Sequence, residues 1–222
     1  MLGVILEKQD MKRKFLLIFF LITSINYSQV QKIFYVDDVE TIDEVTVEFC
    51  VNDSARIDKV TIIPEKTTYK NEYAIGQLIE YLKTIQYYPD SKLKNNCYPS
   101  TFQFVNKKYE NAKLKESEFP ACKKFKKGKF KYTDIRYLDT KIKRTKRKQK
   151  EKDDTFKAKY KINWTSPYEY EMTYIKVRED KNKHLLGKTI TVEIIGLLED
   201  GYIYLADFMN KPTIIGEIKK IR

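Results

Sequence analysis

Few residues of this 222-residue chain could support catalysis. Its one histidine, His184, lies next to Leu185 and Leu186 and could act as a general base. No Cys or Ser motif accompanies it, so we expect a histidine in a surface loop. The seven glycines form neither a GxGxxG fingerprint nor a P-loop, and a single histidine excludes a His-rich metal site. We therefore expect a protein that is not an enzyme and needs no metal or cofactor.

Glu169 and Glu171 are a second candidate for acid–base chemistry, because they lie two residues apart on one face of a predicted strand. The alternative, which we favour, is that they pair across the sheet with lysines of the preceding strand. The aromatic side chains that alternate through this region could line a ligand cavity, but we expect them to form an ordinary core.

Basic side chains are concentrated in one region. Residues 121–161 contain 18 Lys and Arg against five Asp and Glu, a surplus of 13, when the whole chain carries a net charge of +12. This stretch could neutralise phosphates of nucleic acid or of lipid head groups. The alternative, which we favour, is a solvated hairpin whose lysines discourage aggregation. The candidate anionic site within it consists of Lys141, Lys143, Arg144, Lys146, Arg147, Lys148 and Lys150.

The N-terminus has the pattern of a signal peptide over residues 1–28. Basic residues 12–14 precede an apolar run over 15–22, and small and polar residues follow. The run is shorter than the ~20 residues that span a bilayer, so we expect cleavage after Ser28 rather than an anchor. Residues 1–10 are expected to be an extension upstream of the natural start. These features predict an exported protein that is periplasmic, envelope-associated or extracellular.

Residues 45–107 are predicted to form a small sheet with one helix. Strands are expected at 45–51 and 57–63, and a helix follows where apolar side chains recur at helical spacing over 74–85. A third strand is expected at 101–106. A right-handed crossover gives the sheet order 2-1-3, with the third strand at an open edge.

The three cysteines are candidates for oxidation in an exported protein. In the predicted sheet order the first and third strands are antiparallel, so Cys50 near the end of one lies close to the start of the other, which comes just after Cys97. We expect a Cys50–Cys97 disulfide, with Cys122 left as a free thiol.

The first region resembles the C-terminal domain of the TonB energy-transducer family. The similar residues are VTVEFCVNDSARIDKVTIIP, the helix AIGQLIEYLKTIQYYP and then TFQF, within residues 45–107. In that family the domain lies in the periplasm and captures a segment of a receptor by adding a strand to its sheet. The resemblance implies a peptide-binding edge formed by Thr101, Phe102, Gln103, Phe104, Val105 and Asn106.

After an N-terminal segment (29–44), the TonB-like module and a linker (108–120), residues 121–222 are predicted to be all-β. Seven strands are expected in an antiparallel meander, as a curved sheet or a small barrel, so the fold class is α+β. The predicted strands are 130–138, 141–149, 156–164, 168–174, 189–198, 202–208 and 213–221.

This second region resembles a module of uncharacterised exported bacterial proteins, through CKKFKKGKF, INWTSPYEYEMTY and GEIKKI. A three-residue loop over 165–167 would place Trp164 opposite Tyr168 and Lys161 opposite Glu171.

Two functions are compatible with these patterns. The first is an exported, non-enzymatic protein that binds an envelope protein or peptide by strand addition along residues 101–106. The second is a binder of a small lipophilic or anionic ligand in the β-rich region, with an anionic lipid or glycan as the partner of the basic stretch. Nucleic acid is not expected, because the signal peptide directs the chain away from it. The sequence leaves the oligomeric state open.

Overall fold

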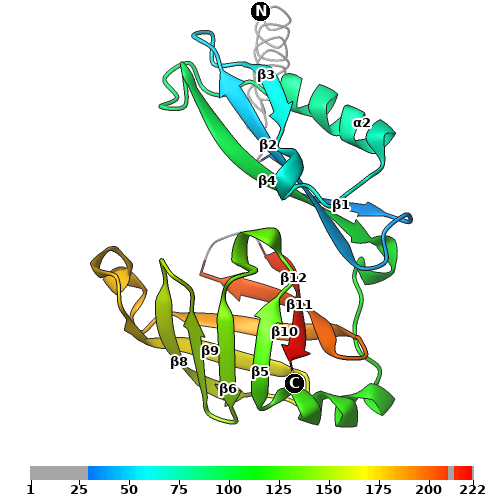
Figure 1. The fold of residues 1–222 in the computed structure, drawn as a ribbon, viewed down its shortest axis with the longest axis vertical. Helices are drawn as coiled ribbons and strands as arrows, with labels where there is room; N and C mark the ends of the chain where they lie inside the picture. Colours follow the sequence, from blue (N-terminus) through cyan, green and yellow to red (C-terminus); the bar gives the residue numbers. More distant parts are fainter. Residues whose placement is uncertain (1–29, 210–212, 222) are drawn as a thin grey trace, which may run out of the picture.

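A computed structural model describes residues 30–209 and 213–221, so the predicted signal peptide (1–28) lies outside the described part of the chain. Two units follow one another along the long axis of the molecule (Figure 1): a sheet with one helix, and an antiparallel barrel. The fold is therefore α+β and mostly β. No helix of the described residues is long and apolar enough to cross a membrane.

The first unit is a four-stranded mixed sheet in the order β1-β4-β2-β3. Asn71 caps its helix by accepting a hydrogen bond from the Ala74 N–H at 3.1 Å, and Leu78 and Leu82 bury the apolar helix face against the sheet. The elements are β1 (Ile33–Val36), β2 (Ile42–Val51), β3 (Ile57–Ile62), η1 (Pro64–Lys66), α2 (Glu72–Lys83) and β4 (Asn96–Asn106).

The open edge predicted at the third strand is wrong, because β1 occupies most of it. β1 runs parallel to β4, with Ile33 opposite Gln103 and Val36 opposite Asn106. The Gln103 N–H donates to the Lys32 carbonyl at 2.8 Å. Four of the six residues predicted as a binding edge, Gln103–Asn106, are thus paired on both sides. β1 escaped prediction because four residues are too few to establish a strand period.

A disulfide joins β2 to β4. Cys50 and Cys97 lie directly opposite each other, with their Cα atoms 4.0 Å apart. This is the pairing that the antiparallel strand arrangement predicts. Cys122 is free and buried.

The predicted linker (108–120) is not a simple spacer. It holds the end of η2 (Lys107–Tyr109) and half of the 3-10 helix η3 (Glu116–Phe125), which lies across one end of the barrel (Figure 1). Cys122 and Phe125 have no exposed surface. Because they follow Phe119 at intervals of three residues, they share one face of a 3-10 helix, a period that helical and strand templates do not detect.

The second unit is a closed eight-stranded barrel in the order β10-β11-β12-β5-β6-β7-β8-β9. It has one strand more than predicted, because a turn at Lys146 and Arg147 divides the strand expected at 141–149. Its strands are β5 (Gly128–Tyr132), β6 (Lys141–Thr145), β7 (Lys148–Lys152), β8 (Lys157–Trp164), β9 (Glu169–Val177), β10 (Thr189–Leu197), β11 (Gly201–Phe208) and β12 (Ile214–Ile221), with η4 (Ile135–Tyr137) and η5 (Asp180–Leu185) in loops.

The β8–β9 hairpin is paired two residues away from the predicted register. Lys161 lies opposite Thr173 rather than Glu171. The loop is longer than three residues because the Ser166 hydroxyl accepts a hydrogen bond from the Glu169 N–H at 2.9 Å. An offset of two residues keeps every side chain on its predicted face but removes the expected Lys–Glu pair.

A buried apolar cluster joins the two units. Polar contacts flank it, since the Thr41 hydroxyl donates to Glu217 Oε2 at 2.7 Å and the Ile135 N–H donates to Glu44 Oε2 at 2.9 Å. The buried members of the cluster are Val105, Tyr109, Ile195, Ile203 and Ile215.

Phe125→Ala should destabilise the protein by about 3–5 kcal/mol, because it removes a fully buried ring of η3 from the end of the barrel that η3 covers. Urea unfolding monitored by fluorescence measures this loss. Leu138→Ala is the control, since Leu138 is 51% exposed and its loss should change stability by less than about 0.5 kcal/mol. Equal losses of stability in the two variants would contradict the role of η3 as the cover of this end of the barrel.

Candidate functional site: the barrel cavity

The barrel contains a partly open cavity of about 470 Å³. Pockets that hold one small molecule measure roughly 300–1,000 Å³, and barrels of eight strands are wide enough for one small ligand. The alternating aromatic side chains therefore line a cavity as well as forming a core. The walls are mostly apolar and aromatic and include Phe156, Tyr160, Met172, Tyr174, Ile190, Val192, Tyr204, Ala206, Phe208 and Ile214.

Arg144 points into the barrel and is only 2% exposed, so its predicted place in an exposed anionic site is wrong. Its guanidinium donates to the hydroxyls of Tyr202 at 2.8 Å and Tyr170 at 3.0 Å, and to the Phe125 carbonyl at 3.2 Å. Its Nε donates to Gln149 Oε1 at 2.5 Å. These acceptors make the buried charge tolerable.

Glu151 lies next along the same polar network. It accepts hydrogen bonds from Gln149 Nε2, from the Tyr132 hydroxyl at 2.9 Å and from the Tyr160 hydroxyl at 3.1 Å. Burial raises the pKa of Glu151, although these hydrogen bonds and the charge of Arg144 act in the opposite direction.

The two tyrosines beside this carboxyl remain hydrogen-bond donors. Burial and the neighbouring charge of Glu151 raise the pKa of Tyr132 and of Tyr160 well above the usual tyrosine range. The interior thus offers a carboxyl, an amide and several hydroxyls among apolar walls.

The end of the cavity opposite η3 is lined by η4 and the β7–β8 loop. Arg136 forms an ion pair with Asp134 at 2.5 Å, and Tyr137 beside it is 49% exposed. Burial opposes the charge of Arg136 most strongly, but the hydrogen bond and charge of Asp134 together with the charge of Glu44 raise the arginine pKa. Glu44 of the sheet also approaches Arg136, at 3.7 Å, and connects the first unit to this end of the barrel.

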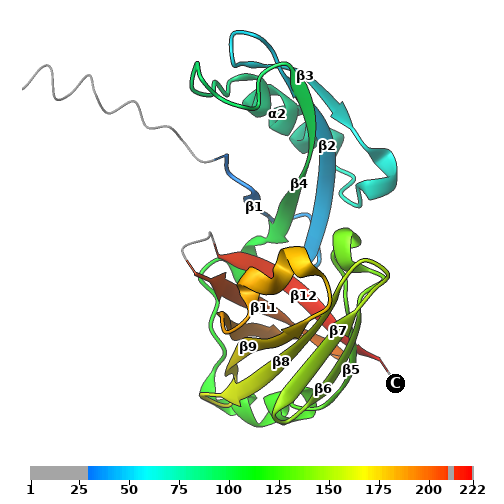
Figure 2. The same cartoon turned by 90° about the vertical axis from the view of Figure 1, so that its left-hand side faces the viewer.

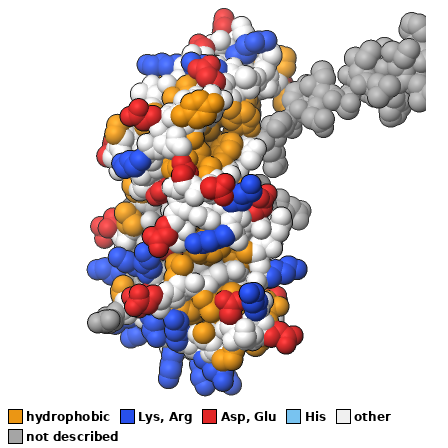
Figure 3. Space-filling view, turned by 90° about the vertical axis from the view of Figure 1, so that its right-hand side faces the viewer, with side chains coloured by type: hydrophobic (Ala, Val, Ile, Leu, Met, Phe, Trp, Pro, Cys, Tyr) orange, Lys and Arg blue, Asp and Glu red, His pale blue; other side chains and the backbone are white. Residues whose placement is uncertain are grey.

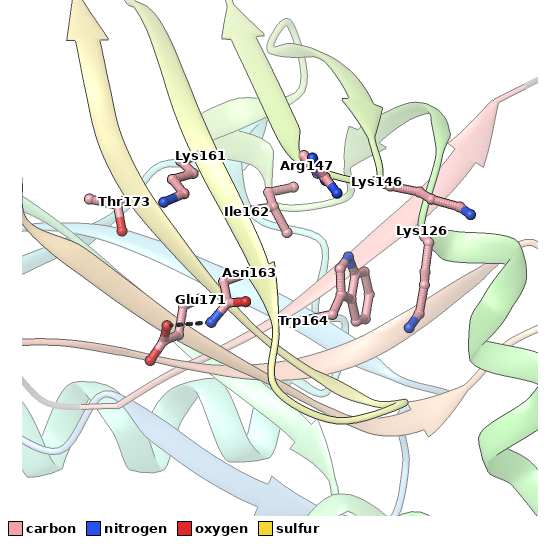
Figure 4. A pocket seen from close by; sticks show the side chains of 9 residues that line it. All are labelled: Lys126, Lys146, Arg147, Lys161, Ile162, Asn163, Trp164, Glu171 and Thr173. Atoms are coloured by element: carbon pink, nitrogen blue, oxygen red, sulfur yellow. Dashed lines mark hydrogen bonds between the residues drawn. The ribbon is translucent and has the colours of Figure 1, made fainter.

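A second hollow, of about 740 Å³, lies on the outer surface of the barrel (Figure 4). Trp164 forms part of its wall, and the Lys126 ammonium lies 4.6 Å from the centroid of the Trp164 ring. Asn163 Nδ2 donates to Glu171 at 3.2 Å. Four cationic side chains line this hollow: Lys126, Lys146, Arg147 and Lys161.

The predicted anionic site is divided by the structure. Its turn residues, Lys146 and Arg147, line the outer hollow, and Arg144 lies inside the barrel. The remaining members are exposed on β6 and β7 and do not line the hollow: Lys141, Lys143, Lys148 and Lys150.

The candidate catalytic residues do not come together. His184 lies in η5, where its Nδ1 is 2.8 Å from the Lys181 carbonyl, and it does not line the cavity. Glu169 accepts a hydrogen bond from the Thr165 hydroxyl at 2.8 Å, and Glu171 accepts one from Asn163 Nδ2. Among the described residues, neither forms the expected pair with a lysine.

Comparison with known proteins finds no matching family model, no similar curated protein and no similar solved structure for this chain. The resemblances of the two regions to known modules therefore stay predictions.

Glu151→Gln should flatten the dependence of thermal stability on pH. Because burial raises the pKa of Glu151, the protonated form favours folding. Its contribution is fully present below the ordinary pKa of glutamate and is lost as the pH rises through the raised value. Tm measured from about pH 4 to pH 8 should therefore fall less in the variant. An unchanged slope would show that Glu151 does not titrate in this range.

Proposed function

We propose that the chain is an exported, non-enzymatic envelope protein whose barrel binds one small lipophilic molecule that carries a hydrogen-bonding group. The observation that carries this proposal is the cavity of about 470 Å³ with apolar walls and a buried polar network. An apolar pocket with a few convergent polar groups is the usual form of a small-molecule site.

The chemistry of the interior defines the class of ligand. An apolar body fits beside Phe156, Met172 and Val192, whereas Glu151 can accept a further hydrogen bond from a hydroxyl, an amine or an amide. A carboxylate or phosphate ligand is disfavoured next to Glu151. Because Arg144 is already satisfied by protein acceptors, an anionic group would have to displace them.

The Cys50–Cys97 disulfide supports export, because such bonds persist in oxidising compartments. The succession β2, β3, α2 and β4 supports the likeness of the first unit to the TonB C-terminal domain. Peptide capture along Gln103–Asn106 is not proposed, because β1 pairs with these residues.

Ala206→Trp should abolish ligand binding, because a large side chain would fill the cavity. The probe is 1-anilinonaphthalene-8-sulfonate or N-phenyl-1-naphthylamine, the second being uncharged, and their fluorescence should rise on binding to the wild-type chain. The uncharged probe should bind more tightly, given the carboxyl of Glu151 inside.

Asp207→Trp is the matched control, since Asp207 is the next residue of β11 and is exposed on the outer face. It adds the same ring without filling the cavity, and binding should persist. If Ala206→Trp folds with native circular dichroism and still binds the uncharged probe, the cavity is not the binding site. If the cavity is the site, native mass spectrometry of the wild-type chain from its own cell should show a bound molecule that is absent from Ala206→Trp.

A further inference from the structure

Lysines form two rows across the outer wall of the barrel. The register places Lys143 directly opposite Lys129 on one side and Lys150 on the other, and the same arrangement repeats from strand to strand. The first row is Lys219, Lys131, Lys141, Lys152 and Lys157, and the second is Lys129, Lys143, Lys150, Lys159 and Lys176. Figure 2 looks onto β5 to β9, which carry all of these lysines except Lys219 of β12.

Nearly all of these lysines face one another without a carboxylate that neutralises their charge. Like charges directly opposite each other destabilise a sheet. Among the described residues, Lys219 is the only member of the rows within salt-bridge distance of a carboxylate, Glu217 at 3.2 Å. The face shown in Figure 3 differs, because acidic and basic side chains are interspersed on it. The lysine rows thus concentrate one sign of charge on one wall.

The spacing of the rows suits a linear polyanion. Neighbouring strands lie about 4.8 Å apart, so five lysines span roughly 19 Å around the barrel, and residues two apart on a strand separate the rows by about 7 Å. The outer hollow with Lys126, Arg147 and Lys161 continues the basic surface, because Lys161 lies opposite Lys148 beside the second row.

The composition of this wall argues against two kinds of polyanion. Single-stranded nucleic acid is held by exposed aromatic stacking platforms, and the outward positions of β5 to β8 between Lys129 and Asn163 are lysine, threonine or asparagine. A bilayer is flat, whereas the rows follow the curvature of a barrel, and the exposed apolar side chains Ile221 and Ile175 lie at opposite ends of the second row. A flexible anionic chain can follow the curve.

We propose that the lysine rows bind an acidic polysaccharide. All ten row residues are lysines, whose compact hydrated charge recognises charge density rather than a planar group in one orientation. The attraction releases counterions from the polymer, so it should weaken steeply with salt. This site is separate from the cavity, and it stands whether or not the barrel binds a small molecule.

The test is binding of the full chain to heparin and to polygalacturonate at low and high salt, with neutral dextran as the negative probe. The variant is the triple change Lys143→Gln, Lys150→Gln and Lys159→Gln, in the middle of the second row. It should weaken binding about tenfold or more at low salt and reduce the salt dependence. Its Tm without polysaccharide should be unchanged or higher, because repulsion is relieved.

The matched control is Lys66→Gln, Lys70→Gln and Lys92→Gln, three exposed lysines of the sheet unit that remove the same total charge. Its affinity should stay close to that of the wild type. Three results would each overturn the proposal: equal losses in both triple variants, tighter binding to phosphatidylglycerol vesicles than to either polysaccharide, or equally tight binding to oligo-dT. Continued binding of the uncharged probe N-phenyl-1-naphthylamine by the row variant would show that the cavity is intact.

Discussion

The hydrogen bonds of Arg144 are the constraint on which the barrel depends. They connect four parts of the chain: η3 through the Phe125 carbonyl, β7 through Gln149, β9 through Tyr170 and β11 through Tyr202. A buried ion costs several kcal/mol in lost hydration, so the folded state must supply all these acceptors together. The closed end of the barrel, its wall and the floor of its cavity therefore form as one unit.

The β6–β7 hairpin contributes side chains to both the inside and the outside of the barrel. Inward positions of β6 and β7 carry Arg144, Gln149 and Glu151, and the positions between them carry lysines. A slip of one residue would bury lysines and expose the network, which gives the register a large energetic preference. Repulsion between facing lysines, about 0.2–1 kcal/mol for each pair, is small beside that preference. The interior hydrogen-bond network can thus hold this wall of the barrel together against the repulsion between the lysines on its outer face.

Much of the fold could be predicted from local patterns. The Asn71 cap, the α2 period and the alternation from Phe156 to Trp164 each give a strong signal over many residues. The Cys50–Cys97 pair was predictable because it needs only the direction of two neighbouring strands.

The features that escaped prediction depend on contacts distant in sequence. β1 is defined by pairing with residues some 70 positions later, and η3 by the barrel end that it covers. Arg144 is one of seven basic residues within 141–150, so the composition of this stretch predicted that it is exposed like the others. The sign that Arg144 faces inward is Ile142, which lies two residues earlier on the same face of the strand, and the turn at Lys146 and Arg147, without Gly, Pro or Asn, gives little signal.

The burial of Cys122 has a consequence for oxidative folding. Disulfide exchange requires a thiolate that can reach another sulfur, and burial both removes access to Cys122 and raises its pKa. Once η3 has covered the barrel end, the third thiol is kinetically withdrawn. An incorrect bond to either cysteine of the sheet can then form only while the barrel is still open. By covering Cys122, η3 therefore also protects the Cys50–Cys97 pairing in the other unit of the molecule.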